Sequence, residues 1–196
     1  VGDMIEGPEA SLAPEVQAYG RIQAKDGVFG VTGNHEWHHG AAPWVQFFED
    51  NGVTMLENKH SVIARGNAQL VIAGTTDRSA LRYGDHGPDL KKALEGAPDA
   101  ATILLAHQPK GAKEVSGVDL QLSGHTHGGL YALMQPVVAY FNDGFVRGLY
   151  KVSETMQLYV SPGTGLWTGM ALRVMDPSEI TEIVLRARAQ PKTQSD

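Results

Sequence analysis

The chain has 196 residues and is acidic, with 16 Lys and Arg against 22 Asp and Glu and a formal net charge of −6. Its hydrophobic fraction of 42% is typical of a globular domain and argues against a disordered chain. The acidic balance disfavours sequence-independent nucleic-acid binding, and the absence of cysteine excludes disulfides, cysteine-ligated zinc and a thiol nucleophile.

Short apolar runs alternate with turn-rich and helical stretches, which predicts a layered α/β domain over residues 1–188. The expected helices cover residues 41–51, which Gly52 ends, and 88–96, which Pro88 begins. The expected strands, in chain order, are 27–32, 53–56, 61–64, 69–73, 102–106, 119–122, 145–152, 157–160 and 180–185. Residues 189–196 show no periodicity, and we expect a disordered tail there.

One apolar segment, residues 130–141, has two possible roles. The first is packing in the core, which we favour. The second is an exposed apolar wall that contacts an acyl chain or a membrane surface. No stretch of the sequence is long and apolar enough to be a lipid-spanning helix, so we expect this part of the protein to be soluble.

Histidines gather at the ends of predicted strands. His35 lies in Gly-Asn-His-Glu after the first strand, and His107 follows the most hydrophobic strand. His125 and His127 lie in Gly-His-Thr-His after the next strand. Because sites in open α/β sheets form in the loops at the carboxyl ends of strands, this placement predicts a common site. The remaining histidines are interpreted as surface or supporting residues: His38, His39, His60 and His86.

The side chains at these turns suit a metal site. Candidate ligands are the imidazoles of His107, His125 and His127, the amide oxygen of Asn34 and the carboxylate of Asp3. Imidazole together with oxygen ligands suits Mn, Fe or Zn, and the lack of thiolate disfavours a structural zinc site. For each segment alone, a turn with capping polar groups is the competing interpretation. Their joint occurrence in order favours the metal site.

The sequence resembles the calcineurin-like metallophosphoesterases. The matching motifs occur in the family's order, at residues 2–7, 33–36, 107 and 124–127. The C-terminal part is similar to a bacterial, membrane-associated branch of that family, which is associated with lipid-like phosphoesters. That similarity rests on residues 159–165, Arg173 and Glu179-Ile180.

The resemblance implies a centre of two divalent ions, Mn, Fe or Zn. Asp3 would bridge the ions, Asn34, His107 and His125 would complete one of them, and His127 would bind the other. The implied fold is a four-layer sandwich of two facing mixed β-sheets flanked by helices.

The resemblance also gives His35 a role, as the general acid that protonates the leaving oxygen and not as a metal ligand. Two ions about 3.5–4 Å apart would activate a water for in-line attack on phosphorus. The expected substrate is a phosphodiester or a lipid-like phosphoester, and no nucleic acid is expected as a partner.

Two features depart from the family's pattern. Glu6 stands where the family usually has Asp, and the family's Asp-x-His motif, expected upstream of Asp3, is not in the sequence. We therefore expect the chain to be the C-terminal part of a longer protein, without the first strand and helix of the fold. A missing N-terminal segment would then carry the membrane contact.

These departures leave a second hypothesis open. The chain could be a catalytically silent fragment, or a metal-binding or interaction domain that lacks one metal site and holds one ion or none. His35 next to Asn34 argues for the enzyme, and the missing motif argues for the silent fragment.

Overall fold

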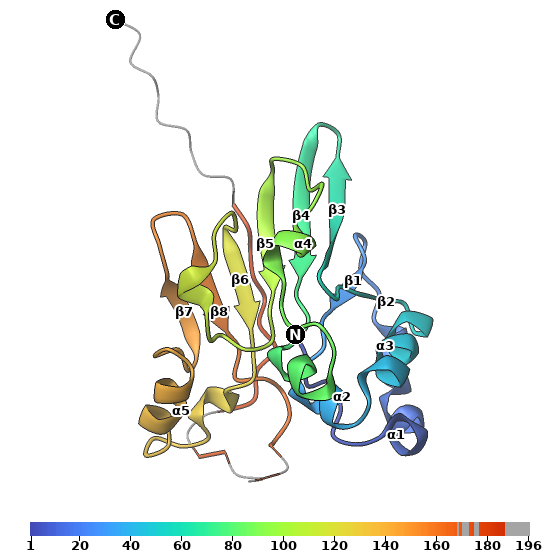
Figure 1. Cartoon of the computed structure of the whole chain (residues 1–196), viewed down its shortest axis with the longest axis vertical. Coiled ribbons are helices and arrows are strands. Elements are labelled where there is room, and N and C mark those ends of the chain that lie inside the picture. The colour runs from blue at the N-terminus through green and yellow to red at the C-terminus, as the bar shows by residue number, and fades with distance from the viewer. Residues whose placement is uncertain (168, 170–172, 175–176, 187–196) are drawn as a thin grey trace, which may run out of the picture.

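The computed structural model describes residues 1–167, 169, 173–174 and 177–186, and its strands form a large and a small β-sheet (Figure 1). The large sheet has six strands in the order β3-β4-β5-β6-β8-β7. Their bounds are β3 Lys59–Arg65, β4 Ala68–Gly74, β5 Ala101–Leu105, β6 Leu120–Ser123, β7 Gly148–Lys151 and β8 Gln157–Val160. The small sheet pairs β1 (Val28–Gly30) with β2 (Val53–Met55) in parallel.

The large sheet is mixed. Strands β4, β5, β6 and β8 run parallel to one another, while β3 and β7 are antiparallel edge strands. The carboxyl ends of the four parallel strands therefore meet at one edge of the sheet, where α/β proteins place their sites.

Five α-helices and four 3-10 helices connect the strands of the described chain. The α-helices are α1 Glu9–Val16, α2 Asn34–His38, α3 Ala41–Asp50, α4 Leu90–Ala93 and α5 Gln135–Phe141. The 3-10 helices are η1 Gln17–Arg21, η2 Arg78–Tyr83, η3 Ala112–Glu114 and η4 His127–Gly129. No helix of the described residues combines the length and the apolarity that crossing a bilayer requires.

Apolar side chains cover the small sheet on both faces. On one face, Trp44 and Phe48 of α3 pack with Val53 and Met55 of β2. The other face meets the large sheet through a buried cluster of Val31, Leu56, Ile72 and Leu105.

The opposite face of the large sheet is covered near its centre. Val71 of β4 and Leu104 of β5 form a buried cluster there, and Leu90 of α4 packs against it. In Figure 1, α4 accordingly lies over β4 and β5. Both faces of the central strands are buried, which explains their continuous apolar runs.

Most predicted elements are confirmed, with changed bounds. The hairpin is β3–β4, longer than predicted, with Arg65 opposite Ala68. The helix predicted over 88–96 shortens to α4, because the Asp89 side chain caps it by accepting from Lys92 N at 2.9 Å. The strand predicted over 145–152 shortens to β7, since Gly148 has a φ of 86°. Helices α1, α2 and α5 were not predicted.

The strand predicted over 180–185 is wrong: these residues form no ladder with the strands described. Ile180 is 92% exposed and Val184 67% exposed, so the segment lacks the neighbouring strand that would bury it. The expectation of two mixed sheets is confirmed in part. The six-stranded sheet is mixed, but the second sheet consists of the parallel pair β1 and β2. The tail predicted over 189–196 lies outside the described residues.

The interpretation of residues 130–141 as core is also wrong. Helix α5 buries none of its side chains, and Leu133 and Tyr140 are 85% and 82% exposed. Leu130 is buried, whereas Val137 and Phe141 are exposed as well. The apolar side chains of this segment are exposed to solvent, and the sequence pattern alone does not distinguish an exposed apolar face from a buried one.

Trp44 is the side chain whose loss should most weaken the packing of α3. It is fully buried, stacks on Phe48 with a ring separation of 5.7 Å, and donates from Nε1 to the Gly7 carbonyl at 3.0 Å. We expect Trp44→Ala to lower the free energy of unfolding by about 3–5 kcal/mol, measured by urea denaturation. The exposed Leu133→Ala control should change it by less than about 0.5 kcal/mol. Equal losses in the two variants would contradict this account.

Candidate metal centre

The centre begins at Asp3, which lies in a tight turn. Both Gly2 and Asp3 have positive φ, 71° and 50°. Asp3 Oδ1 accepts a hydrogen bond from the His35 backbone N at 2.8 Å, which ties the turn to the start of α2. Gly33 permits this approach, because a Cβ there would lie 2.3 Å from Asp3 Oδ1. A glycine at position 33 is therefore required by close contact.

His107 follows β5 and is 2% exposed. Its Nδ1 lies 2.9 Å from the carbonyl oxygen of Val1. Because a carbonyl oxygen only accepts, Nδ1 must carry the proton of this bond. The other nitrogen, Nε2, is thereby directed at the remaining side chains of the centre, as the second nitrogen of a metal-ligating histidine usually is.

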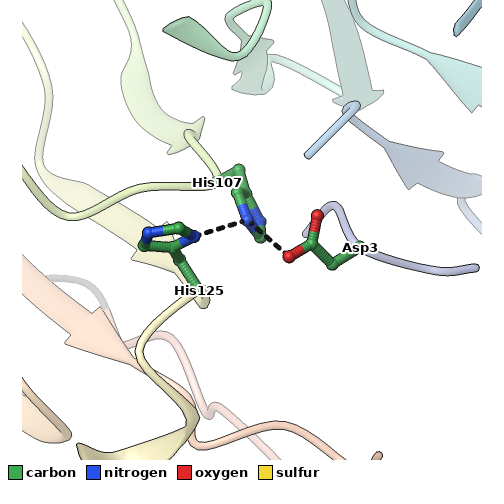
Figure 2. A group of neighbouring side chains, drawn as sticks. All are labelled: Asp3, His107 and His125. Atoms are coloured by element: carbon green, nitrogen blue, oxygen red, sulfur yellow. Dashed lines mark hydrogen bonds and ion pairs between the residues drawn. The ribbon is translucent and has the colours of Figure 1, made fainter. Parts of the chain in front are cut away.

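Three side chains converge on Nε2 of His107. Asp3 Oδ2 lies 3.0 Å from it, Asn34 Oδ1 3.1 Å and His125 Nδ1 3.2 Å. Figure 2 shows the imidazole of His107 between Asp3 and His125. Nε2 holds at most one proton, so it hydrogen-bonds to these three atoms one at a time. These four ligand-type atoms lie close together, and Asp3, His107 and His125 could hold a metal ion.

Burial and charge set the protonation of these groups. Burial would raise the pKa of Asp3, but the charge and hydrogen bond of His107 and the N–H of His35 hold that pKa well below its usual range. Burial would lower the pKa of His107, but attraction to Asp3 raises it above its usual value. Burial and repulsion from His107 lower the pKa of His125 to about 4. The imidazole of His125 is thus neutral near pH 7.

Backbone strain marks the segment after β6. His125 and His127 have φ values of 71° and 48°, which non-glycine residues seldom adopt. Such conformations persist where the surroundings hold them, and they cluster at functional sites.

His127 lies outside the three-residue cluster but lines the same cleft, whose volume is about 670 Å³. Its Nδ1 is buried and has no hydrogen-bond partner among the described residues. Burial and the nearby Arg173 guanidinium lower the pKa of His127. A neutral imidazole with an unpartnered buried nitrogen is consistent with a missing ligand, since buried polar atoms nearly always have a partner.

His35 lies beside the cluster, with only part of its ring exposed. Its Nδ1 is 2.8 Å from Oε2 of Glu6, and its Nε2 is 3.8 Å from Oδ2 of Asp3. Nε2 therefore points toward the centre, while Glu6 holds the far side of the ring. Of the predicted site residues, Asp3, Asn34, His35, His107 and His125 come together, and His127 stands at the wall of the cleft.

Glu36 supports the centre, and the sequence analysis gave it no role. It is fully buried, and its carboxylate accepts from the backbone N–H groups of Asp3, Met4 and Gly33 at 2.9, 2.6 and 2.6 Å. Burial and repulsion from Asp3 raise the pKa of Glu36. A Glu three residues after the glycine that begins a helix is the capping-box spacing, and that signal could have identified it.

Comparison with known proteins gives a consistent result. Residues 1–129 match the calcineurin-like phosphoesterase family. A transmembrane protein with metallophosphoesterase domain from Bos taurus is 38% identical over 95% of this chain and 45% of that protein. An uncharacterized metallophosphoesterase of Helicobacter pylori is 36% identical over 99% of this chain and 51% of that protein. One from Bacillus subtilis is 27% identical over 95% of the chain. The chain spans about half the length of the first two.

Replacing Glu36 should loosen the centre without touching a ligand. In Glu36→Gln the amide NH₂ would face backbone N–H groups that need acceptors, so the Asp3 turn would lose its anchor. We expect Mn²⁺ affinity, measured by calorimetry on the folded variant, to fall about 10–100-fold. The exposed Glu49→Gln control should bind Mn²⁺ as the parent chain does, and Glu36→Asp should be intermediate. An unchanged affinity in Glu36→Gln would refute this supporting role.

Proposed function

The chain belongs to the calcineurin-like metallophosphoesterase family, and we propose that its centre hydrolyses a phosphoester with the help of bound divalent metal ions. The observation that carries this proposal is the convergence of Asp3, Asn34 and His125 on Nε2 of His107, with His35 beside them. Because this arrangement offers both metal ligands and a proton donor, it provides what metal-assisted hydrolysis requires.

The donor set would coordinate one ion fully and a second ion only in part. Asp3, Asn34, His107 and His125 would hold one ion, and Asp3 with His127 would hold part of another. Imidazoles and hard oxygens suit Mn, Fe or Zn. When bound, such ions polarise phosphoryl oxygens and lower the pKa of a coordinated water. The buried, unpartnered Nδ1 of His127 supports its inclusion.

His35 would supply the proton that the leaving oxygen takes. With Nδ1 donating to the Glu6 carboxylate, the proton delivered must come from Nε2, which points toward the centre. The carboxylate of Glu6 would hold the ring in this orientation. Glu6 would thus orient His35 in place of the Asp of the family pattern, since its longer side chain also reaches the ring.

The second ion decides between an enzyme and a silent domain. No Asp-x-His occurs in the 196 residues, and the cluster in the described chain gathers ligands around one point only. The alternative is a metal-binding domain without turnover, in which Asp3, His107 and His125 would hold a single ion. Metal analysis separates the two: two ions per chain with activity supports the enzyme, and one ion or none without activity supports the silent domain. That an Asp-x-His motif outside residues 1–196 supplies the remaining ligands of the second ion stays a prediction. Sequencing the reading frame upstream of Val1 tests it.

The substrate and the location of the whole protein belong to the same proposal. The Bos taurus relative is named a transmembrane protein, and helix α5 of this chain exposes Val137, Tyr140 and Phe141. No charged side chain occurs between residues 120 and 142. Aromatic and aliphatic side chains without charge suit the interfacial region of a bilayer. We therefore propose membrane association and a lipid-like phosphoester as substrate, with the whole domain forming the four-layer sandwich of the family.

His35→Ala tests the general acid. We expect turnover of an alkyl phosphodiester to fall about 10²–10⁴-fold while metal content stays unchanged. The loss should be much smaller for a p-nitrophenyl ester, because nitrophenolate leaves without a proton. His39→Ala, an exposed neighbour, is the control and should leave both rates unchanged. Equal losses for the two esters would show that His35 is not the acid.

Vesicle binding tests the membrane contact. The double variant Tyr140→Ser and Phe141→Ser should reduce sedimentation with phosphatidylglycerol vesicles several-fold, because it removes the aromatic side chains that would enter the interface. Leu149→Ser, which changes a 62% exposed apolar side chain on β7, should sediment like the parent chain. Unchanged sedimentation of the double variant would exclude α5 as the contact.

A further inference from the structure

A second cleft, of about 920 Å³, lies between η2 and the segment 86–92, which includes the first residues of α4. It shares none of its lining residues with the cleft of the metal centre. Its lining has a polar floor that includes Asn58 and Gln108, and an apolar part that includes Leu81 and Pro88. The volume is that of a small-molecule site.

The lining of this second cleft is cationic, although the chain is acidic. Arg78, Arg82 and Lys92 line it together with His86. None of the three permanent cations forms a salt bridge within the described part of the chain. The one acidic side chain of the lining, Asp89, accepts from the Lys92 backbone as the cap of α4. A local excess of positive charge on a protein of net charge −6 would attract an anion.

The floor of the cleft is held rigidly. Asn58 is 4% exposed and has a φ of 51°, which is unusual for a non-glycine residue. Its Oδ1 accepts from the backbones of Thr76 and Asp89, and its Nδ2 donates to the Gly87 carbonyl. One side chain thus holds the end of β4 against the segment 87–89. The backbone that carries the cationic residues is therefore already ordered before a ligand binds, which lowers the entropic cost of binding.

Contacts link this cleft to the metal centre. Gln108, on the floor, follows His107 directly in the chain and donates from Nε2 to both oxygens of Asp77. Asp77 in turn accepts from Ser79 N as the cap of η2. A smaller pocket, lined by both His107 and Arg78, lies between the two sites. Gln108 and Asp77 thus connect the second cleft with the residue next to His107.

We propose that this cleft binds the phosphate of an organic anion. Arg78 and Arg82 provide the planar donors that pair with phosphate oxygens, and Lys92 adds a point charge. The cleft is larger than a single phosphate needs, and its apolar residues, Leu81, Pro88 and Leu90, would contact the organic part. The proposal does not depend on the hydrolytic function, because it rests on the charge and frame of this cleft alone.

Anion binding by the metal-free chain tests the proposal. Pyrophosphate is titrated calorimetrically into the full chain after removal of metal, at 150 mM salt. We expect saturable binding of one anion per chain, weakened at least 10-fold in the double variant Arg78→Ala and Arg82→Ala. The control Arg21→Ala and Lys25→Ala removes the same charge from exposed positions and should change binding less than twofold. Absence of saturable binding, or equal weakening in both variants, overturns the proposal.

A kinetic arm identifies the source of the phosphate. The Arg78/Arg82 variant and the parent chain, both metal-loaded, are compared on bis-p-nitrophenyl phosphate and on an ester that carries a second phosphate. Loss of kcat/KM for the second ester alone means that the cleft takes a group of the substrate. If the variant and the parent chain have equal kcat/KM values on both esters but the variant has lost pyrophosphate binding, the cleft binds a free phosphorylated molecule. Since the calorimetry needs no turnover, an inactive chain would refute the proposed function and leave the cleft testable.

Discussion

The buried carboxylate of Glu36 is the constraint on which the centre depends. It joins the backbone of residues 3 and 4 to that of residue 33, so two segments 30 residues apart become one rigid unit. Asp3 can then face His107 without a strand of its own to support it. The cost is a negative charge taken out of water beside a second carboxylate, which is tolerated because three N–H donors surround it. A metal ion near Asp3 would offset the remaining repulsion.

The sequence predicted the parts of the centre that lie at strand ends. His107 and His125 follow β5 and β6, and parallel strands carry such residues to one edge, so their meeting could be anticipated from order alone. The residues that support the centre could not be predicted in this way. Glu36 and Glu6 act through the backbone and through His35, and although the spacing of Glu36 from Gly33 marks a helix cap, it does not show that the same carboxylate also anchors residues 3 and 4.

The failures of the fold prediction have a common cause. Residues 130–141 were expected to pack in the core and residues 180–185 to form a strand, yet Leu133 and Ile180 are almost fully exposed. Hydrophobic pattern indicates that a segment seeks an apolar surface, but it does not say whether that surface belongs to the same chain. Where the partner is internal, as for Val71 and Leu104, the prediction of a buried strand is confirmed.

The spread of the ligands along the chain has one more consequence. Asp3 and His107 are 104 positions apart, and they meet only in the folded chain. An unfolded chain therefore offers no equivalent chelate, and an ion that binds does so almost entirely to the native state. By mass action, free metal at 100 times its Kd adds about 2.7 kcal/mol to the stability of the fold. If the centre binds metal as proposed, the metal supply would therefore change the stability of the fold in addition to any effect on turnover.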